Sequence, residues 1–108
     1  MANNELDLSK IEGFDWDEGN IDKSWKKHEV HYKEAEEVFQ NLPRVLLIDE
    51  KHSITEKRFI IWGRTDKNRN LAVVFTIRNK KIRVISVRDM NKKERSEYEK
   101  KTKKNTTI

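Results

Sequence analysis

The chain has 108 residues, a length suited to one domain around a single hydrophobic core. Hydrophobic residues make up 34% and charged residues 40%, and the lack of cysteine excludes disulfide bonds and thiolate metal sites. No apolar run approaches the roughly 20 residues of a membrane helix. The first residues lack the layout of a signal peptide, so we expect a cytoplasmic protein.

Charge divides the chain into two unlike halves. Residues 1–50 contain 6 Lys and Arg against 13 Asp and Glu, a net charge of −7, whereas residues 51–108 contain 18 against 6, a net charge of +12. A basic surface attracts a polyanion. We therefore expect nucleic acid to bind the second half, on one side of the molecule.

The N-terminal segment predicts little regular structure. Residues 1–12 are polar, with Leu6, Leu8 and Ile11 scattered among them and too few to bury, so we expect a flexible lead-in. Residues 13–16 alternate apolar and polar side chains, which is typical of a short strand at the edge of a sheet.

Two helices are predicted next. Asp17 is suited to cap a helix over about 18–27, and Ile21 and Trp25, four residues apart, are expected to share its buried face. The second helix spans 31–40, where apolar residues recur at helical spacing and a proline shortly follows.

After that proline the apolar pattern becomes that of extended chain. Four runs rich in β-branched and aromatic residues predict antiparallel strands at 44–49, 58–64, 71–78 and 81–89. The third run is apolar at both parities, as expected of a central strand covered on both faces. Asn79 suits the positive φ of the tight turn that follows it.

The C-terminal segment predicts a helix. Asn91 and Glu94 have the spacing of a capping box, which indicates a helix over about 92–101 and a disordered tail over 102–108. The predicted fold class is α+β, in a single domain over 13–101. Two N-terminal helices pack on an antiparallel sheet of about four strands, and a C-terminal helix follows.

A series of short motifs runs between about residues 13 and 100. These motifs are Phe14-x-Trp16-Asp17, Lys27-His28, Glu34-Ala35-x-x-Val38-Phe39, Asp49-x-Lys51-His52-Ser53, Glu56-x-Arg58, Gly63-Arg64-Thr65, Ile82-Arg83-Val84-Ile85-Ser86-x-Arg88 and Glu94-Arg95-x-x-x-Tyr98. In this order and spacing they resemble the BrnT family of toxins from bacterial toxin–antitoxin pairs. Two positions depart from that pattern: Glu29 stands where many members have glycine, and Ser24 where many have a helix asparagine. We expect the first to alter how the chain leaves the helix and the second to move a polar contact near the site.

The resemblance implies a fold related to the RelE and ParE toxins and an activity that degrades RNA and arrests growth. It also implies a BrnA-type antitoxin partner with a ribbon-helix-helix DNA-binding domain, assembled with the toxin as a heterotetramer. DNA would then be contacted only through the antitoxin, and no cofactor or membrane is implied.

Cleavage of RNA without a metal uses the ribose 2′-hydroxyl as nucleophile, so the protein supplies a base, an acid and donors to the phosphate. Arginine suits the last role, because its guanidinium binds two phosphate oxygens and stays charged. Our candidates are Arg58, Arg83 and Arg88. Arg83 and Arg88 differ by an odd number and should point to opposite faces unless a bulge intervenes. The alternative role for each is a structural pair with an acid such as Glu94 or Glu56.

Glu94 and Tyr98 lie four residues apart, hence on one helix face, and are candidates for the base and for the acid or a phosphate donor. Tyr98 is equally suited to anchor the helix, and Glu94 to cap it. His28 is the best-placed imidazole for proton transfer, although a histidine here also commonly caps a helix C-terminus. Further contacts to RNA are expected from Lys27, Arg64, Lys92 and Arg95.

Other chemistries find weak support. His28 and His31 lack the spacing of a zinc helix, and Ser53 beside His52 lacks the glycine elbow of a serine nucleophile. The three tryptophans lie in apolar patterns and are expected in the core. The main alternative to a ribonuclease is a nucleic-acid-binding or antitoxin-docking module that does not cut. A purely structural domain leaves the basic half unexplained.

Overall fold

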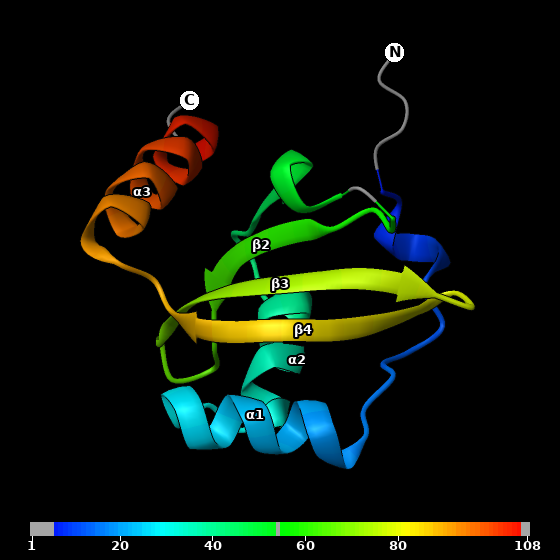
Figure 1. Cartoon of the computed structure of the whole chain (residues 1–108). Coiled ribbons are helices and arrows are strands. Elements are labelled where there is room, and N and C mark those ends of the chain that lie inside the picture. Colours follow the sequence, from blue (N-terminus) through cyan, green and yellow to red (C-terminus); the bar gives the residue numbers. More distant parts are fainter. Residues whose placement is uncertain (1–5, 54, 107–108) are drawn as a thin grey trace.

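A computed structural model describes residues 6–53 and 55–106 of the chain and shows an antiparallel sheet flanked by three α-helices (Figure 1). The elements in chain order are a 3-10 helix over Leu8–Lys10, α1 (Glu18–His28), α2 (Tyr32–Gln40), β1 (Val45–Ile48), a 3-10 helix over Glu50–His52, β2 (Phe59–Arg64), β3 (Asn70–Arg78), β4 (Lys81–Asp89) and α3 (Lys92–Thr106). The predicted α+β class is confirmed.

The sheet has the strand order β1-β2-β3-β4, and each strand pairs antiparallel with the next. All four strands lie where the apolar runs predicted them. Asn79 and Lys80 connect β3 to β4 with φ values of 52° and 64°. Positive φ at both central residues defines a tight turn whose twist matches that of the strands. The prediction for Asn79 is confirmed, and Lys80 shares its conformation.

One face of the sheet carries the main core. Here α2 packs against β2 and β3, and the buried residues are Val30, Ala35, Val38, Phe39, Phe59, Ile61, Leu71, Val73, Phe75, Ile82, Val84 and Val87. Gly63 lies on this face, where an added Cβ would be 2.8 Å from Cγ1 of Val38. A side chain at position 63 would therefore push α2 away from the sheet.

The opposite face, here called the open face, carries Ile60, Trp62, Ala72, Val74, Thr76, Arg83, Ser86 and Arg88. At one end of it, Trp62 and Ala72 form a second small cluster with Met90 and Tyr98, which attaches α3. Elsewhere none of the described helices covers this face (Figure 1). The sheet therefore presents side chains from three strands toward solvent.

A bulge in β4 changes which side chains reach the open face. Val74 pairs with Ser86, whereas the next residue, Phe75, pairs with Val84, so Ile85 is inserted without a partner. The buried residues of β4 are accordingly spaced by two and then by three, at Ile82, Val84 and Val87. An extra residue reverses the alternation beyond it. Arg83 and Arg88 therefore lie on the same face, and the expectation of opposite faces is wrong.

Helix α1 lies along the outer edge of β4, and its polar side chains donate hydrogen bonds to backbone carbonyls at the bulge. Asn20 Nδ2 donates to the carbonyl oxygen of Val84 at 3.2 Å, and Lys23 Nζ donates to that of Ile85 at 3.2 Å. Because buried Asn20 and Ser24 take the inward positions, Trp25 is turned outward and is 54% exposed. The prediction that Trp25 is a core residue is wrong.

The N-terminal segment packs more closely than its composition indicated. Residues 12–15 run beside β4: Phe14 forms a parallel bridge with Ile82, whose backbone N–H donates to the carbonyl oxygen of Gly13 at 2.9 Å. The predicted edge strand thus consists of a single bridge. Leu6, Leu8 and Ile11 are partly buried against the core, which corrects our expectation that they are too few to bury.

The capping signals in the sequence correspond to real caps. The Asp17 carboxylate accepts from the N–H of Asn20 at 3.0 Å at the start of α1, and Asn91 and Glu94 form the predicted capping box of α3. Helix α3 continues to Thr106, five residues beyond the predicted end, so the expected tail is helical over 102–106. None of the described helices combines the length and hydropathy of a membrane-spanning segment.

Candidate functional site

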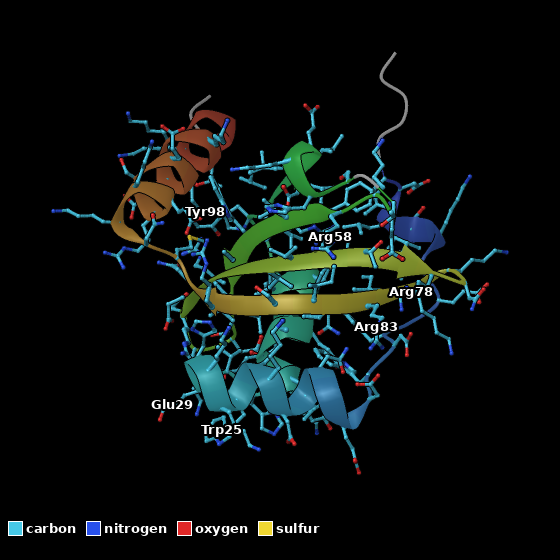
Figure 2. All side chains as sticks on the ribbon, viewed as in Figure 1. Trp25, Glu29, Arg58, Arg78, Arg83 and Tyr98 are labelled. Atoms are coloured by element: carbon cyan, nitrogen blue, oxygen red, sulfur yellow. The ribbon has the colours of Figure 1, made fainter. Side chains whose placement is uncertain are left out.

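Three arginines from three strands line one cleft at the end of the open face remote from α3. These are Arg58, immediately before β2, Arg78 at the end of β3 and Arg83 near the start of β4 (Figure 2). The cleft has a volume of about 730 Å³, and its other walls come from Glu56 and from the N-terminal half of α1. The cleft also contains the carboxylates of Asp17 and Glu18, so its guanidinium groups, and not a large net charge, suit it to an anion.

The sheet register explains why these side chains meet. Arg83 pairs with Thr76 of β3, and Arg58 lies one residue before Phe59, which pairs with Phe75. Continuing that register by one residue aligns Arg58, Thr76 and Arg83 in a row across the sheet. Arg58 is held there by its backbone, because its N–H donates to Ser53 Oγ at 2.9 Å and its carbonyl accepts from Asp49 at 2.9 Å.

Two of the three cleft arginines are engaged by carboxylates. Arg83 Nη2 donates to Asp17 Oδ2 at 2.7 Å, and its Nη1 lies 3.5 Å from Asp15 Oδ2. Arg78 donates to both oxygens of Glu56, at 2.8 and 3.1 Å. Within the described part of the chain, the guanidinium of Arg58 has no hydrogen bond or ion pair. Arg58 is therefore ready to bind an anion without releasing a partner.

Two acids of the cleft, Glu56 and Asp17, have lowered pKa values. The hydrogen bond from Arg78 holds the pKa of Glu56 below its usual value, and the charges of Arg58 and Arg83 act in the same direction. The N–H of Asn20, followed by Arg83, lowers the pKa of Asp17. The ionised carboxylates are therefore favoured by the same contacts that fix Arg78 and Arg83 in the cleft.

Arg88, Glu94 and Tyr98 form a separate group beneath α3. Arg88 donates to both oxygens of Glu94, at 2.6 and 2.8 Å, and the same carboxylate accepts from the N–H of Asn91. The bond from Arg88 lowers the pKa of Glu94. Tyr98 is buried and donates its hydroxyl proton to the Pro43 carbonyl at 2.6 Å. These contacts dock α3 on the sheet.

The two groups share the open face but not one site. Arg88 pairs with Ala72 and Arg83 with Thr76, and the four residue steps along β3 between those partners span about 13 Å. The structure therefore brings Arg58 and Arg83 together and leaves Arg88, Glu94 and Tyr98 in a second position along the same surface.

The other candidates are distributed around the open face. His28 and Lys27 line a small hollow beside Ser86 at the C-terminal end of α1. Arg64 lies at the far end of β2, beside α3, and Lys92 and Arg95 are exposed on α3. Ser53 and His52 do not pair: the serine hydroxyl donates to the Asp49 carbonyl, whereas the His52 ring contacts the Asp49 carboxylate. The described residues contain no group of three suited to hold a metal.

Sequence reasoning missed Arg78 and Lys23 as members of the cleft, and named Glu56 only as an arginine partner. Arg78 is the last residue of a predicted strand, and its position two residues after Thr76 places it on the open face. Strand parity was the signal that would have found it. Lys23 reaches the cleft because α1 follows the edge of β4, and no local pattern indicates that placement.

A basic α+β domain whose open sheet face gathers arginines from three strands is the architecture of a polyanion-binding protein. Comparison with known families agrees with this. The family described as the ribonuclease toxin, BrnT, of type II toxin–antitoxin systems matches residues 16–94, and the chain belongs to that family. It is thus a ribonuclease toxin, and an antitoxin is its partner. A search of the curated proteins found no match.

Proposed function

We propose that this toxin is a metal-independent endoribonuclease whose scissile phosphate binds at the cleft formed by Arg58, Arg78 and Arg83. The observation that carries this proposal is the guanidinium of Arg58, which has no partner among the described residues and lines one cleft with two arginines that carboxylates hold in place. Such a preorganised set of donors stabilises the charge that develops on phosphate as the 2′-oxygen attacks.

The second group on the open face holds α3 against the sheet, and the cations of this helix extend the RNA-binding surface. Arg88 and Glu94 fix the start of α3, and Tyr98 anchors that helix. Lys92 and Arg95 on α3, together with Arg64 and Lys27, offer charges to flanking phosphates on either side of the face. Such contacts to phosphates supply affinity for RNA without a preference for its sequence.

The partner that we propose is a BrnA-type antitoxin with a ribbon-helix-helix DNA-binding domain, in a heterotetramer that contacts DNA through the antitoxin. An antitoxin segment with carboxylates would bind the same arginines as RNA and so exclude it. We place the protein in the cytoplasm, where both RNA and such a partner occur.

The test is cleavage of purified RNA in the presence of EDTA. The wild-type protein is expected to degrade total RNA, and Arg58→Ala to reduce the rate by about 100-fold, the typical loss when a donor to the transition state is removed. Lys33→Ala is the matched control, because Lys33 is an exposed cation on α2, behind the sheet. Binding without cleavage by the wild type would instead indicate an inert nucleic-acid-binding module.

A further inference from the structure

Glu56 lies where a ribonuclease of this geometry needs a base. Its carboxylate lines the cleft with Arg58, Arg78 and Arg83, the three arginines assigned above to the phosphate. We propose that Glu56 is the general base that removes the proton of the attacking 2′-hydroxyl. This inference rests on the proposed phosphate site and adds a catalytic role to a residue otherwise accounted for as the partner of Arg78.

The hydrogen bonding of Glu56 leaves room for substrate. Each carboxylate oxygen accepts one bond from Arg78, and an ionised carboxylate offers about four acceptor positions in all. The side chain is 31% exposed, so solvent and substrate reach it. The pair with Arg78 fixes the carboxylate within the cleft and still leaves lone pairs free for a hydroxyl.

The other acids and the imidazole are less well placed for this step. Glu94 accepts two bonds from Arg88 and one from Asn91. Its partner Arg88 pairs with Ala72, about 13 Å along β3 from Thr76 in the Arg58 row. Asp17 is committed to capping α1 and to Arg83. His28 lies at the opposite end of α1 from Asp17. Of these three carboxylates, Glu56 combines a place beside Arg58 in the cleft with free acceptor capacity.

The reaction step balances without a metal. Glu56 takes the proton of the 2′-hydroxyl as the 2′-oxygen forms a bond to phosphorus, while Arg58 and Arg83 bind the non-bridging oxygens. The bond from phosphorus to the 5′-oxygen breaks, and that oxygen takes a proton from a solvent water, which leaves hydroxide to be neutralised by the proton on Glu56. The products are a 2′,3′-cyclic phosphate and a 5′-hydroxyl end.

The surrounding charges make the basicity of Glu56 depend on substrate. In the free protein the arginines favour its ionised form, which makes it a weak base. A bound phosphate neutralises part of that positive charge, so the proton affinity of Glu56 rises when RNA is in place. The charged residues around Glu56 in its two adjoining hollows are Asp7, Lys10, Glu12, Asp17, Glu18, Lys23, Lys57, Arg58, Arg78, Lys80 and Arg83.

The experiment compares wild type with Glu56→Gln, which keeps the shape and removes the base, on a short RNA. We expect kcat to fall by about 100-fold or more, with binding of a 2′-O-methyl RNA within about 3-fold of wild type. The acidic limb of the pH profile should lie at higher pH in kcat than in kcat/KM, because the first reports the RNA complex. Glu56→Gln should lose this limb.

Control variants distinguish a wrong choice of base from a wrong phosphate site. Glu99→Gln, an exposed acid on α3, should leave the rate and its pH profile unchanged. Arg78→Gln tests whether breaking the ion pair alone abolishes activity, and thermal melting shows whether each variant is folded. If Arg58→Ala is inactive but Glu56→Gln cleaves at the wild-type rate, the base is not Glu56 and the phosphate site stands. If Arg58→Ala and Arg83→Ala remain fully active, the proposed site itself is wrong.

Discussion

Arg83 and Arg88 lie on the same face of β4 although five positions separate them, because the bulge at Ile85 reverses the strand alternation between them. Their partners differ. Arg83 contacts Asp15 and Asp17 at the cleft, whereas Arg88 forms a two-bond pair with Glu94 beneath α3. One surface thus carries an arginine that lines the cleft and an arginine that anchors α3.

Substitution of these two arginines should therefore have unlike effects. Arg83→Ala is expected to reduce RNA cleavage by about 100-fold with little change in stability. Arg88→Ala should lower the free energy of unfolding by about 1–2 kcal/mol, because it leaves the largely buried Glu94 without its partner. Urea unfolding and a cleavage assay on both variants check this. Equal losses of activity in both variants, at equal stability, would contradict the assignment of Arg83 to cleavage and of Arg88 to stability.

Tyr98 is the main apolar anchor of α3. Tyr98→Phe removes only the hydroxyl bond to Pro43 and should cost about 1 kcal/mol. Tyr98→Ala also empties the pocket formed with Trp62 and Met90 and should cost about 3–4 kcal/mol. Hydrogen exchange should show α3 losing protection in the alanine variant before the sheet does. Uniform loss of protection would mean that α3 is not a separate unit.

Glu29 occupies a position that favours glycine. It terminates α1 with φ 54° and ψ 41°, the left-handed conformation, which costs a residue with a Cβ about 1 kcal/mol. Glu29→Gly should therefore raise the free energy of unfolding by up to about 1 kcal/mol in urea titrations. Glu29→Ala, which removes the charge but keeps the Cβ, should give no such gain. A gain of the same size for alanine would assign the effect to charge.

Stability should fall in acid partly through Glu94. Arg88 holds the pKa of this carboxyl below its unfolded value, so the folded protein binds fewer protons than the unfolded chain around pH 4. The contribution is present above the unfolded pKa, near 4.3, and is lost as pH falls through the folded pKa. In Glu94→Gln the decline of the free energy of unfolding below pH 5 should be shallower. Parallel curves would exclude Glu94 as a source.

The antitoxin and RNA should compete for the open face. In the complex we expect slower hydrogen exchange in β4 and at the start of α3, around Glu94 to Tyr98. RNA should displace the antitoxin more readily at low salt, because the contacts between the toxin's cations and RNA phosphates weaken as salt rises. Protection confined to α1 and α2, with RNA still bound at full affinity, would show that inhibition acts from a distance.

Much of the fold follows from local signals in the sequence. The caps at Asp17 and Asn91, the positive φ at Asn79 and the apolar runs of the four strands depend on neighbours within a few residues. Backbone preferences and side-chain caps operate over that range, so a single sequence carries the information needed. The order and spacing of the short motifs indicated the BrnT family, and the family implied a ribonuclease.

What only the tertiary structure decided depends on residues distant in the chain. The bulge at Ile85 lies in the register against β3 and at the bonds that α1 gives to Val84 and Ile85, so strand parity alone put Arg83 and Arg88 on opposite faces. Trp25 faces outward because Asn20 takes an inward position of α1, where its side chain donates to the carbonyl oxygen of Val84. The pairing of Glu56 with Arg78 across two strands likewise has no local signal. Side-chain partners follow from strand register, and register is set by packing over the whole sheet.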